Sequence, residues 1–396
     1  MHVQESYDKF ADLWDSQCDV LETDSDYEAF IHGLARFTSL TRVVITPSAH
    51  GRPFVPFSPL YETPMIRSLP TGLNYPIPFS WPVTHDWDEL PLETVWNGKE
   101  TDNQEVIDML KQRWRGFRAA LQTLAYAQHQ VTELVIDVNH LRTGISARIF
   151  TEPCEEYDNM VRLLKRPGFR RLDLSLMVGG EEKDNWACFC NGNLRKALQN
   201  ASNLQHLSLR TDVSFDLMEM DHIRMDDDSD ASDWHYVPLR TIFPVNKLQS
   251  LVHFGLSNFL VKDTNIVSLL SGIPGTLRSV ELSFLRFCDN GGNIGRLVAK
   301  MKNGLRWNER PEDARPKVTI GVHLCFRQVG RAIWVTNEVD DFLYRTGFNP
   351  FSKYGVADWV GVVRDAFNPK VVRHRRDRRG ADRDTWGYWE GYGKLK

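Results

Sequence analysis

Cysteine, histidine and carboxylate side chains that lie close together in a sequence could bind a metal or transfer protons. Cys188-Phe-Cys190 is spaced too closely for the usual zinc knuckle, and no second Cys or His pair stands at ligand spacing. His85-Asp-Trp-Asp-Glu89 gathers acid–base groups in a loop, but no other motif converges on it. The sequence therefore predicts no metal site, no cofactor and no catalytic residue.

Two other segments could bind ions or phosphate. Residues 216–233 are rich in aspartate, but they lack the glycine and the bidentate Glu of an EF-hand calcium loop. We interpret them as a solvated acidic loop, with docking of a basic partner as the alternative. Gly291-Gly-Asn-Ile-Gly295 lacks the Lys-Ser/Thr of a phosphate loop, so its glycines are expected to form a turn before a helix.

The C-terminal end of the chain combines basic and aromatic residues. Residues 371–396 contain Arg373-His-Arg-Arg-Asp-Arg-Arg379, followed by Trp and Tyr among glycines. We predict a disordered, solvated tail. The functional alternatives are a nuclear import signal and, less favoured, stacking of the aromatic residues on single-stranded bases.

A more regular set of polar residues lies inside a recurring phrase, apolar-x-x-apolar-x-apolar. Examples are Leu40-Thr-Arg-Val43-Val-Ile45, Leu204-Gln-His-Leu207-Ser-Leu209 and Leu277-Arg-Ser-Val280-Glu-Leu282. Alternate side chains of a strand point to opposite faces, so the middle apolar residue of each phrase is expected to be buried and its polar neighbours to share the other face. The polar candidates for partner binding are Arg42, Glu133, Asp137, Arg171, Asp173, His206, Arg210, His253, Glu281 and Lys317. Each of them could equally be a solvated strand residue, so the prediction concerns the row as a whole.

Helical periodicity precedes most of these phrases. Phe117, Leu121 and Leu124, for example, fall on one helical face before the second phrase. Residues 239–248 are the exception, since they hold a proline and few periodic positions, and an irregular turn is expected there.

Helices that alternate with short strands favour an α/β fold with a parallel sheet and right-handed crossovers. The strand phrase is typical of leucine-rich repeats, although its spacing mostly exceeds the ~20–29 residues of regular repeats. We therefore predict an irregular leucine-rich-repeat-like solenoid, with parallel strands lining a concave face and helices on the convex side. The alternative is an ordinary α/β domain, but strands of doubly wound sheets are near-continuous apolar runs, unlike these.

Residues 46–110 interrupt the array and are rich in proline and aromatic residues. Proline disfavours regular helix and central strand, while the apolar content exceeds that of disordered linkers. We predict an ordered insertion that packs across the first repeats, with a binding lid as the alternative.

Several phrases resemble the fungal F-box proteins whose C-terminal part is an irregular leucine-rich-repeat-like array. They include Thr46-Pro-Ser-Ala-His-Gly51, Pro59-Leu-Tyr-Glu-Thr-Pro-Met-Ile-Arg67, Leu73-Asn-Tyr-Pro-Ile-Pro78, Arg315-Pro-Lys-Val-Thr-Ile320, Glu338-Val-Asp-Asp-Phe-Leu-Tyr344 and Gly347-Phe-Asn-Pro-Phe351. The resemblance spans residues 28–352 and implies an F-box that docks a Skp-type adaptor of a cullin ubiquitin ligase, with the repeats selecting the substrate. Residues 1–27 contain no Leu-Pro-x-Glu, so the F-box is expected upstream of Met1 or is lacking.

Composition agrees with a folded protein that has no general attraction to polyanions. Apolar residues make up 42%, charged residues 25%, and the net charge is −4. The start lacks a signal peptide and no stretch reaches the ~18–20 apolar residues of a membrane helix. We expect a cytoplasmic or nuclear protein with reduced cysteines, no membrane association and no nucleic-acid partner.

The predicted organisation is an N-terminal helical cap or remnant (1–27), the array (28–322), a C-terminal cap (323–370) and the tail (371–396). The C-terminal cap is expected to contain a helix over 336–346 that ends at Gly347. The predicted function is protein recognition, as the substrate-binding part of an F-box-type ligase receptor and not as an enzyme. The alternatives are a stand-alone interaction module and an α/β hydrolase or transferase.

Overall fold

The computed structural model describes residues 2–47, 70, 73, 81, 108, 111–178, 186–212, 236–288, 290–323, 330–351, 360–368 and 370–374. The α-helices are α1 (Val3–Thr23), α2 (Ser25–Arg36), α5 (Arg115–Tyr126), α6 (Glu155–Leu164), α7 (Ala187–Cys190), α8 (Asn193–Gln199), α10 (Leu239–Ile242), α11 (Asp263–Gly272), α12 (Ile294–Gly304) and α13 (Asn337–Tyr344). The strands are β1 (Arg42–Ile45), β2 (Glu133–Ile136), β3 (Ile145–Ser146), β4 (Arg171–Met177), β5 (His206–Thr211), β6 (His253–Ser257), β7 (Leu260–Val261), β8 (Ser279–Ser283), β9 (Arg286–Phe287), β10 (Lys317–His323), β11 (Arg331–Val335), β12 (Val362–Asp365) and β13 (Val372–His374).

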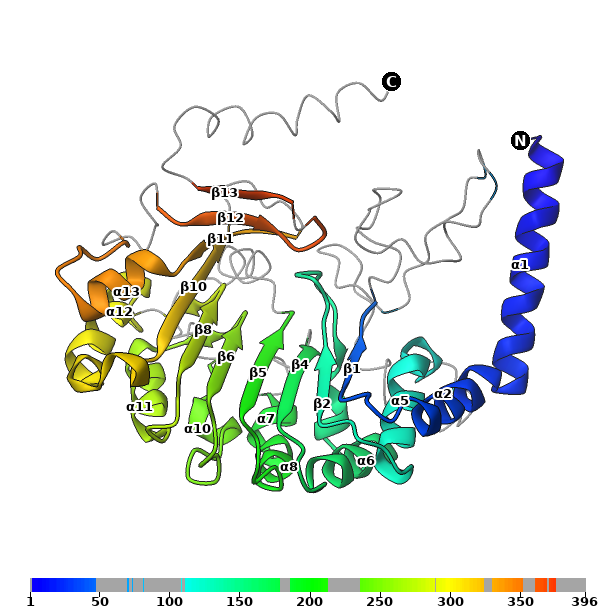
Figure 1. Cartoon of the computed structure of the whole chain (residues 1–396), viewed down its shortest axis with the longest axis horizontal. Coiled ribbons are helices and arrows are strands. Elements are labelled where there is room, and N and C mark those ends of the chain that lie inside the picture. The colour runs from blue at the N-terminus through cyan, green and yellow to red at the C-terminus, as the bar shows by residue number, and fades with distance from the viewer. Residues whose placement is uncertain are drawn as a thin grey trace, which may run out of the picture.

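An 11-stranded sheet in the order β1-β2-β4-β5-β6-β8-β10-β11-β12-β13, with β3 beside β4, organises the molecule (Figure 1). The pairs from β1 to β10 are parallel and follow the chain, as expected where helices connect the strands. The pairs from β10 to β13 are antiparallel. The prediction of a mixed α/β fold with a mostly parallel sheet is confirmed.

The middle apolar residues of the strand phrases align across the parallel strands. The buried members of this row are Leu134, Leu172, Leu207, Phe254, Val280 and Val318. Val43, at the edge, is only partly buried and packs against the core. The predicted phase of the strands is therefore confirmed: these side chains face the core, and their neighbours face the other way.

Helices cover the apolar side of the sheet (Figure 1). Phe117, Leu121 and Leu124 of α5 are fully buried in a core shared with the strands, as their spacing predicted. Among the described residues between β5 and β6, the short helix α10 is the only helix, and it lies where proline and weak periodicity predicted an irregular turn. Gly292, at a φ of 102°, forms the expected turn before α12, and Asn293 caps that helix by accepting a hydrogen bond from the Arg296 N–H.

The N-terminal segment is helical, as predicted, but α1 has no buried residue. It leads away from the sheet, whereas α2 packs against α5 and buries Leu34 (Figure 1). Phe37 stands at helical spacing from Phe30 and Leu34 in the sequence, a spacing that predicts a buried position, but it follows the helix and is 68% exposed. Helix α2 ends at Arg36, which is why Phe37 leaves the helical periodicity.

The C-terminal part differs from the sequence prediction in three respects. The predicted helix over 336–346 is shorter, Asn337–Tyr344. Gly347 does not adopt the positive φ of a helix-closing glycine; glycine is required there because a Cβ would lie 2.9 Å from the Asp341 backbone. Strands β11 and β12 were not predicted, and β13 (Val372–His374) begins inside the predicted tail because it pairs with β12.

Several predicted segments lie outside the described residues. They are most of the insertion at 46–110, the acidic loop at 216–233, His85 to Glu89, and the tail from 375 onward. Over the ranges that the structure does describe, no helix is both long and apolar enough to cross a membrane.

Candidate functional site

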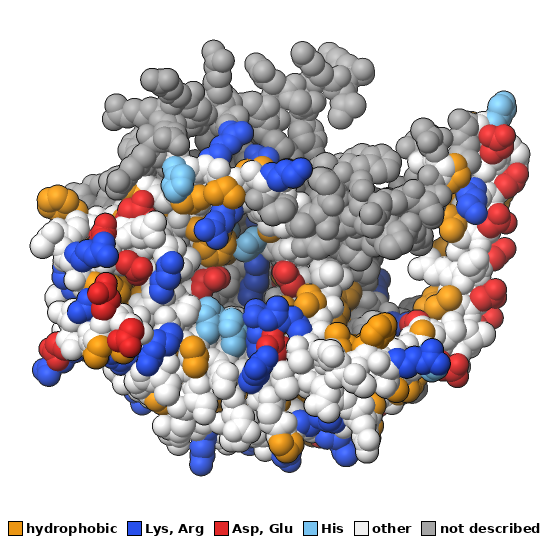
Figure 2. Space-filling view, viewed as in Figure 1, with side chains coloured by type: hydrophobic (Ala, Val, Ile, Leu, Met, Phe, Trp, Pro, Cys, Tyr) orange, Lys and Arg blue, Asp and Glu red, His pale blue; other side chains and the backbone are white. Residues whose placement is uncertain are grey.

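The predicted polar residues form rows across the parallel strands. The register aligns Arg42, Glu133, Arg171, His206, His253 and Lys317, with Ser279 between the last two. Asp173 and Glu281 share the next row on the same face, and Arg210 lies one row further along its strand. Asp137 follows β2, where its N–H donates to the Ile45 carbonyl. The structure thus brings all the candidates to one face, where charged and histidine side chains gather (Figure 2).

Glu133 is a buried carboxylate held between two arginines. Its Oε2 lies 2.6 Å from the Arg42 Nε and its Oε1 lies 3.0 Å from the Arg170 Nη2. Burial alone would raise the pKa of Glu133, but the hydrogen bonds from the two guanidinium groups outweigh burial and lower it. Glu133 therefore fixes two half-exposed arginines on the face and cannot itself reach a partner.

Replacing Glu133 by glutamine is expected to lower the free energy of unfolding by about 1–2 kcal/mol, since charge-assisted hydrogen bonds to a buried group are lost. Urea denaturation at neutral pH measures the change. Lys317→Gln is the control, because Lys317 lies in the same row but is exposed; its effect should stay within about 0.5 kcal/mol. Equal losses at both positions would contradict the assigned role of Glu133.

A second network joins β4, β5 and β6. Asp173 Oδ2 lies 2.6 Å from the Arg171 Nη2, and its Oδ1 lies 2.8 Å from the His206 Nε2. Burial alone would raise the pKa of Asp173, but its bonds to His206 and Arg171 lower it. The His206 and His253 rings stack at 3.9 Å between centroids, and His253 Nδ1 lies 2.9 Å from the Ser279 hydroxyl. Burial, followed by the adjacent His206, lowers the pKa of His253 to about 4.

Ser208, His206 and Asp173 have the residue types of a hydrolase triad but not its geometry. The base of a triad contacts serine through one ring nitrogen and the carboxylate through the other. Here the Ser208 hydroxyl, at 3.3 Å, and Asp173 both approach the same atom, His206 Nε2. His253 Nε2 also approaches Ser208, at 3.4 Å, but its Nδ1 contacts Ser279 and not a carboxylate. These contacts orient the histidines and do not activate a serine.

The remaining candidates differ in accessibility. Lys317 and Asp137 are exposed, and the Asp137 Oδ1 accepts a hydrogen bond from the Asn139 N–H. Glu281 is half-buried, and burial raises its pKa. The Arg210 Nη1 donates to His140 Nδ1 at 2.8 Å.

Sequence reasoning missed several side chains that lie near the C-terminal ends of the parallel strands. They are His140, Ser257, Phe284, His323 and Trp334. His140 and Phe284 adopt positive φ, at 64° and 55°, a conformation that non-glycine residues rarely take. The sequence offered one signal for these residues, namely polar or aromatic residues near the end of a strand phrase. Such residues are also common in ordinary loops, and their spacing does not distinguish the two cases.

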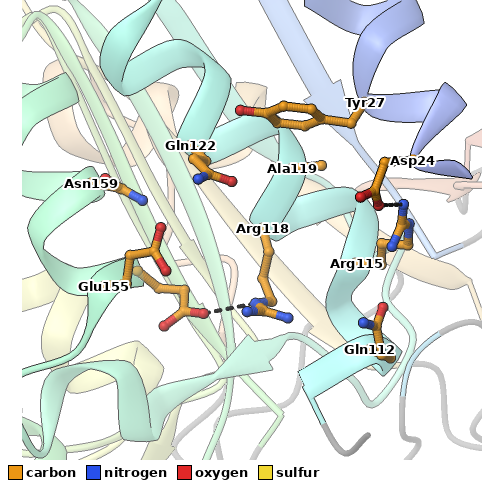
Figure 3. Close-up of a pocket in the computed structure, with 10 residues that line it drawn as sticks. Asp24, Tyr27, Gln112, Arg115, Arg118, Ala119, Gln122, Glu155 and Asn159 are labelled. Atoms are coloured by element: carbon orange, nitrogen blue, oxygen red, sulfur yellow. Dashed lines mark hydrogen bonds and ion pairs between the residues drawn. The ribbon is translucent and has the colours of Figure 1, made fainter. Parts of the chain in front are cut away.

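A pocket of about 320 Å³ opens elsewhere, between α2, α5 and α6 (Figure 3). Most of its charged side chains are paired: Arg115 lies 2.5 Å from Asp24 and 2.8 Å from Asp26, and Arg118 lies 2.8 Å from Glu156. The hydrogen bond from Arg115 lowers the pKa of Asp26, and Asp26 in turn raises the pKa of Arg115. These pairs join the helices, so we assign the pocket a structural role.

Arg115→Ala is expected to destabilise the protein by about 1 kcal/mol, since its carboxylate partners are partly exposed and solvent screens the pairs. Exchange of the backbone amide hydrogens should become faster in α2, because this helix loses its ion pairs to α5. The neighbouring Arg113, which is exposed, provides the control: Arg113→Ala should leave exchange in α2 unchanged. Unaltered exchange in α2 after Arg115→Ala would show that apolar packing alone holds this helix.

Other chemistry considered from the sequence has little support in the geometry. Cys188 is buried in α7, while Cys190 at its end is exposed, so the two thiols do not face a common site. Partial burial of the Cys190 thiol raises its pKa, which disfavours the thiolate that binds metals. Within the described part of the chain, no group of three or more His, Cys, Asp or Glu side chains could hold a metal ion.

The chain has no match among models of known protein families, among curated proteins or among solved structures. The functional assignment therefore rests on the geometry of the polar face and on the residues that form it.

Proposed function

We propose that this chain is a protein-recognition module that binds its partner on the polar face of the parallel sheet. The observation that carries the proposal is the row from Arg42 to Lys317, in which side chains of both signs and two histidines lie side by side across neighbouring strands. Patterned charges favour specificity for one partner over attraction to any polyanion.

The finer architecture that we propose is an irregular leucine-rich-repeat-like solenoid. Its support is that the parallel strands are ordered in the sheet as in the chain, with a helix in most of the connections. In such an array the strands would line the concave face and the helices the convex side, which suits the polar row to an extended partner.

The resemblance to fungal F-box proteins adds a biological context to this proposal. On this hypothesis the chain selects the substrate of a cullin ubiquitin ligase, and a Skp-type adaptor binds an F-box encoded upstream of Met1. Co-purification tests it: adaptor bound to an upstream-extended chain, but not to residues 1–396, would place the F-box there. Adaptor bound by neither chain would favour a stand-alone interaction module.

Matched charge variants test the recognition face directly. Arg171→Gln with Lys317→Glu changes the face, while Arg162→Gln in α6 with Lys165→Glu directly after it makes the same change in charge elsewhere. We expect proteins captured from a fungal extract by the wild-type chain and by the α6 variant to be lost at least about tenfold with the face variant, which corresponds to 1.4 kcal/mol. If all three chains capture the same proteins in equal amounts, the face is not the binding surface.

A further inference from the structure

The centre of the polar face is built from small residues. Ser208 and Gly255 are neighbours in the register, as are Ser257 and Ser283, and then Ser283 and Gly321. A Cβ added at Gly255 would lie 2.4 Å from the Ser208 hydroxyl, and one at Gly321 would lie 2.6 Å from the Ser283 Cβ, so no larger side chain fits without movement. The face is hollowed over these central strands, with longer charged side chains around it (Figure 2).

Arg210 borders this hollow with its guanidinium group. Its hydrogen bond goes to His140 Nδ1, and no carboxylate of the described residues lies within ion-pair distance of it. Because arginine can only donate, His140 must accept through Nδ1 and is therefore neutral. Over the described part of the chain, the buried Arg210 Nε has no hydrogen-bond partner, and neither has the hydroxyl of Ser257, its neighbour in the register.

A half-buried guanidinium with a single hydrogen bond is costly for the fold. Burial lowers the pKa of Arg210 to about 10, although Asp137, Glu281 and Asp212 act in the opposite direction. A buried charge usually has a partner at hydrogen-bond distance, since its lost hydration must be replaced. Arg210 therefore carries unused capacity to donate hydrogen bonds to an anion.

Aromatic rings border the same place. The Phe284 ring stacks on His323 at 4.5 Å between centroids and meets His140 at 5.3 Å and Trp334 at 5.9 Å. Trp334 also lies over Gly321, with its ring 3.0 Å from the position of an added Cβ. Apolar ring surfaces reduce the local dielectric constant and strengthen hydrogen bonds made beside them.

We propose that the hollow beside Arg210 binds a carboxylate group of the recognised partner, with the Arg210 guanidinium and the Ser257 hydroxyl as donors. This inference rests on the proposed recognition function and adds the chemistry of its central contact. A carboxylate suits the site better than a phosphoryl group, because Asp137, Glu281 and Asp212 would repel a dianion more strongly. The group can come from an Asp or Glu side chain or from a chain terminus.

Small carboxylates test the ligand class on the intact chain. N-acetylglutamate α-amide offers a side-chain carboxylate and N-acetylglycylglycine a terminal one; N-acetylglutamine α-amide is the neutral isostere. We expect dissociation constants on the order of 1–10 mM for the better carboxylate and no binding of the isostere. Equal binding of the isostere, or tighter Arg210-dependent binding of inorganic phosphate, would overturn the assigned class.

Two substitutions with opposite expected effects locate the contact. Arg210→Gln should abolish binding of the carboxylate while the melting temperature stays equal or rises, since an unpaired buried charge is removed. Glu281→Gln should tighten binding about threefold, because it removes a nearby like charge. A lower melting temperature for Arg210→Gln, or carboxylate binding that survives it, would overturn the proposal.

The same variants separate this inference from the proposed function. A partner that is captured through the polar face, is lost with Arg171→Gln and Lys317→Glu, and is still captured by Arg210→Gln would leave recognition standing and remove the carboxylate contact. Loss of the partner with Arg210→Gln, together with loss of the small carboxylates, is the expected result.

Discussion

Replacing Leu207 by alanine is expected to lower the free energy of unfolding by about 2–5 kcal/mol. Leu207 is 1% exposed and lies between Leu172 and Phe254 in the buried cross-strand row. The substitution removes apolar burial and leaves a cavity that the flanking strands cannot fill without shifting. Urea denaturation monitored by tryptophan fluorescence and by circular dichroism measures the loss, and coincident transitions would support a two-state analysis.

The matched control is Gln205→Ala, two residues earlier in the same segment. Gln205 is exposed, and its contacts to neighbouring strands are made by its backbone, which alanine keeps. We expect a change within about 0.5 kcal/mol. Comparable losses at Leu207 and Gln205 would mean that burial of the Leu207 side chain is not the source of its loss in stability, and the core assigned to this row would then be wrong.

The phase of the parallel strands was predictable because it follows from local sequence alone. A strand has a side-chain period of two, so a phrase such as Leu204-Gln-His-Leu207-Ser-Leu209 determines which residues are buried. The same rule placed His206 and Arg210 on the opposite face, where the structure has them. Neighbouring phrases then align because each contributes its apolar residues to a common core.

The partners of the polar side chains were not predictable, because they depend on distances between strands that the sequence does not encode locally. Glu133 is held by Arg170 as well as by Arg42, although Arg170 precedes β4 and lies outside the predicted row. His140 reaches Arg210 because the chain adopts positive φ at Asn139 and His140. The sequence contains no pattern that predicts this backbone conformation. The contact between Arg210 and His140 therefore became visible only in the structure.

The C-terminal strands were missed for a different reason. Strands β11 to β13 pair antiparallel and do not repeat the helix–strand unit, so the repeat pattern gave no reason to expect them. One of these strands nevertheless contributes to the candidate site: β11 supplies Trp334, which lies over Gly321 beside the hollow. The candidate site is therefore formed by the parallel strands, which carry the polar row, and by the antiparallel strand β11.

Acidification is expected to destabilise the protein through His253. Its pKa in the folded protein is about 4, lowered first by burial and then by the stacked His206 ring and by Arg171, against the opposite effect of Asp173. The unfolded chain has an ordinary histidine pKa, about 6.5, so between these values it binds a proton that the folded protein does not. The stabilising contribution is complete above the unfolded pKa and is lost as the pH falls toward the folded one. From about pH 7.5 to about pH 5 the loss should reach about 2 kcal/mol.

Denaturation of the wild type and of His253→Gln at both pH values isolates this contribution, since glutamine keeps a polar group near Ser279 but does not titrate. On acidification the free energy of unfolding of the wild type should fall by about 2 kcal/mol more than that of the variant. The contributions of other histidines, such as His140, are present in both proteins and cancel in this comparison. A shared pH dependence would mean that protonated His253 is accommodated beside His206. The stacked pair would then tolerate the positive charge that its geometry disfavours, and the polar face would keep its arrangement in acid.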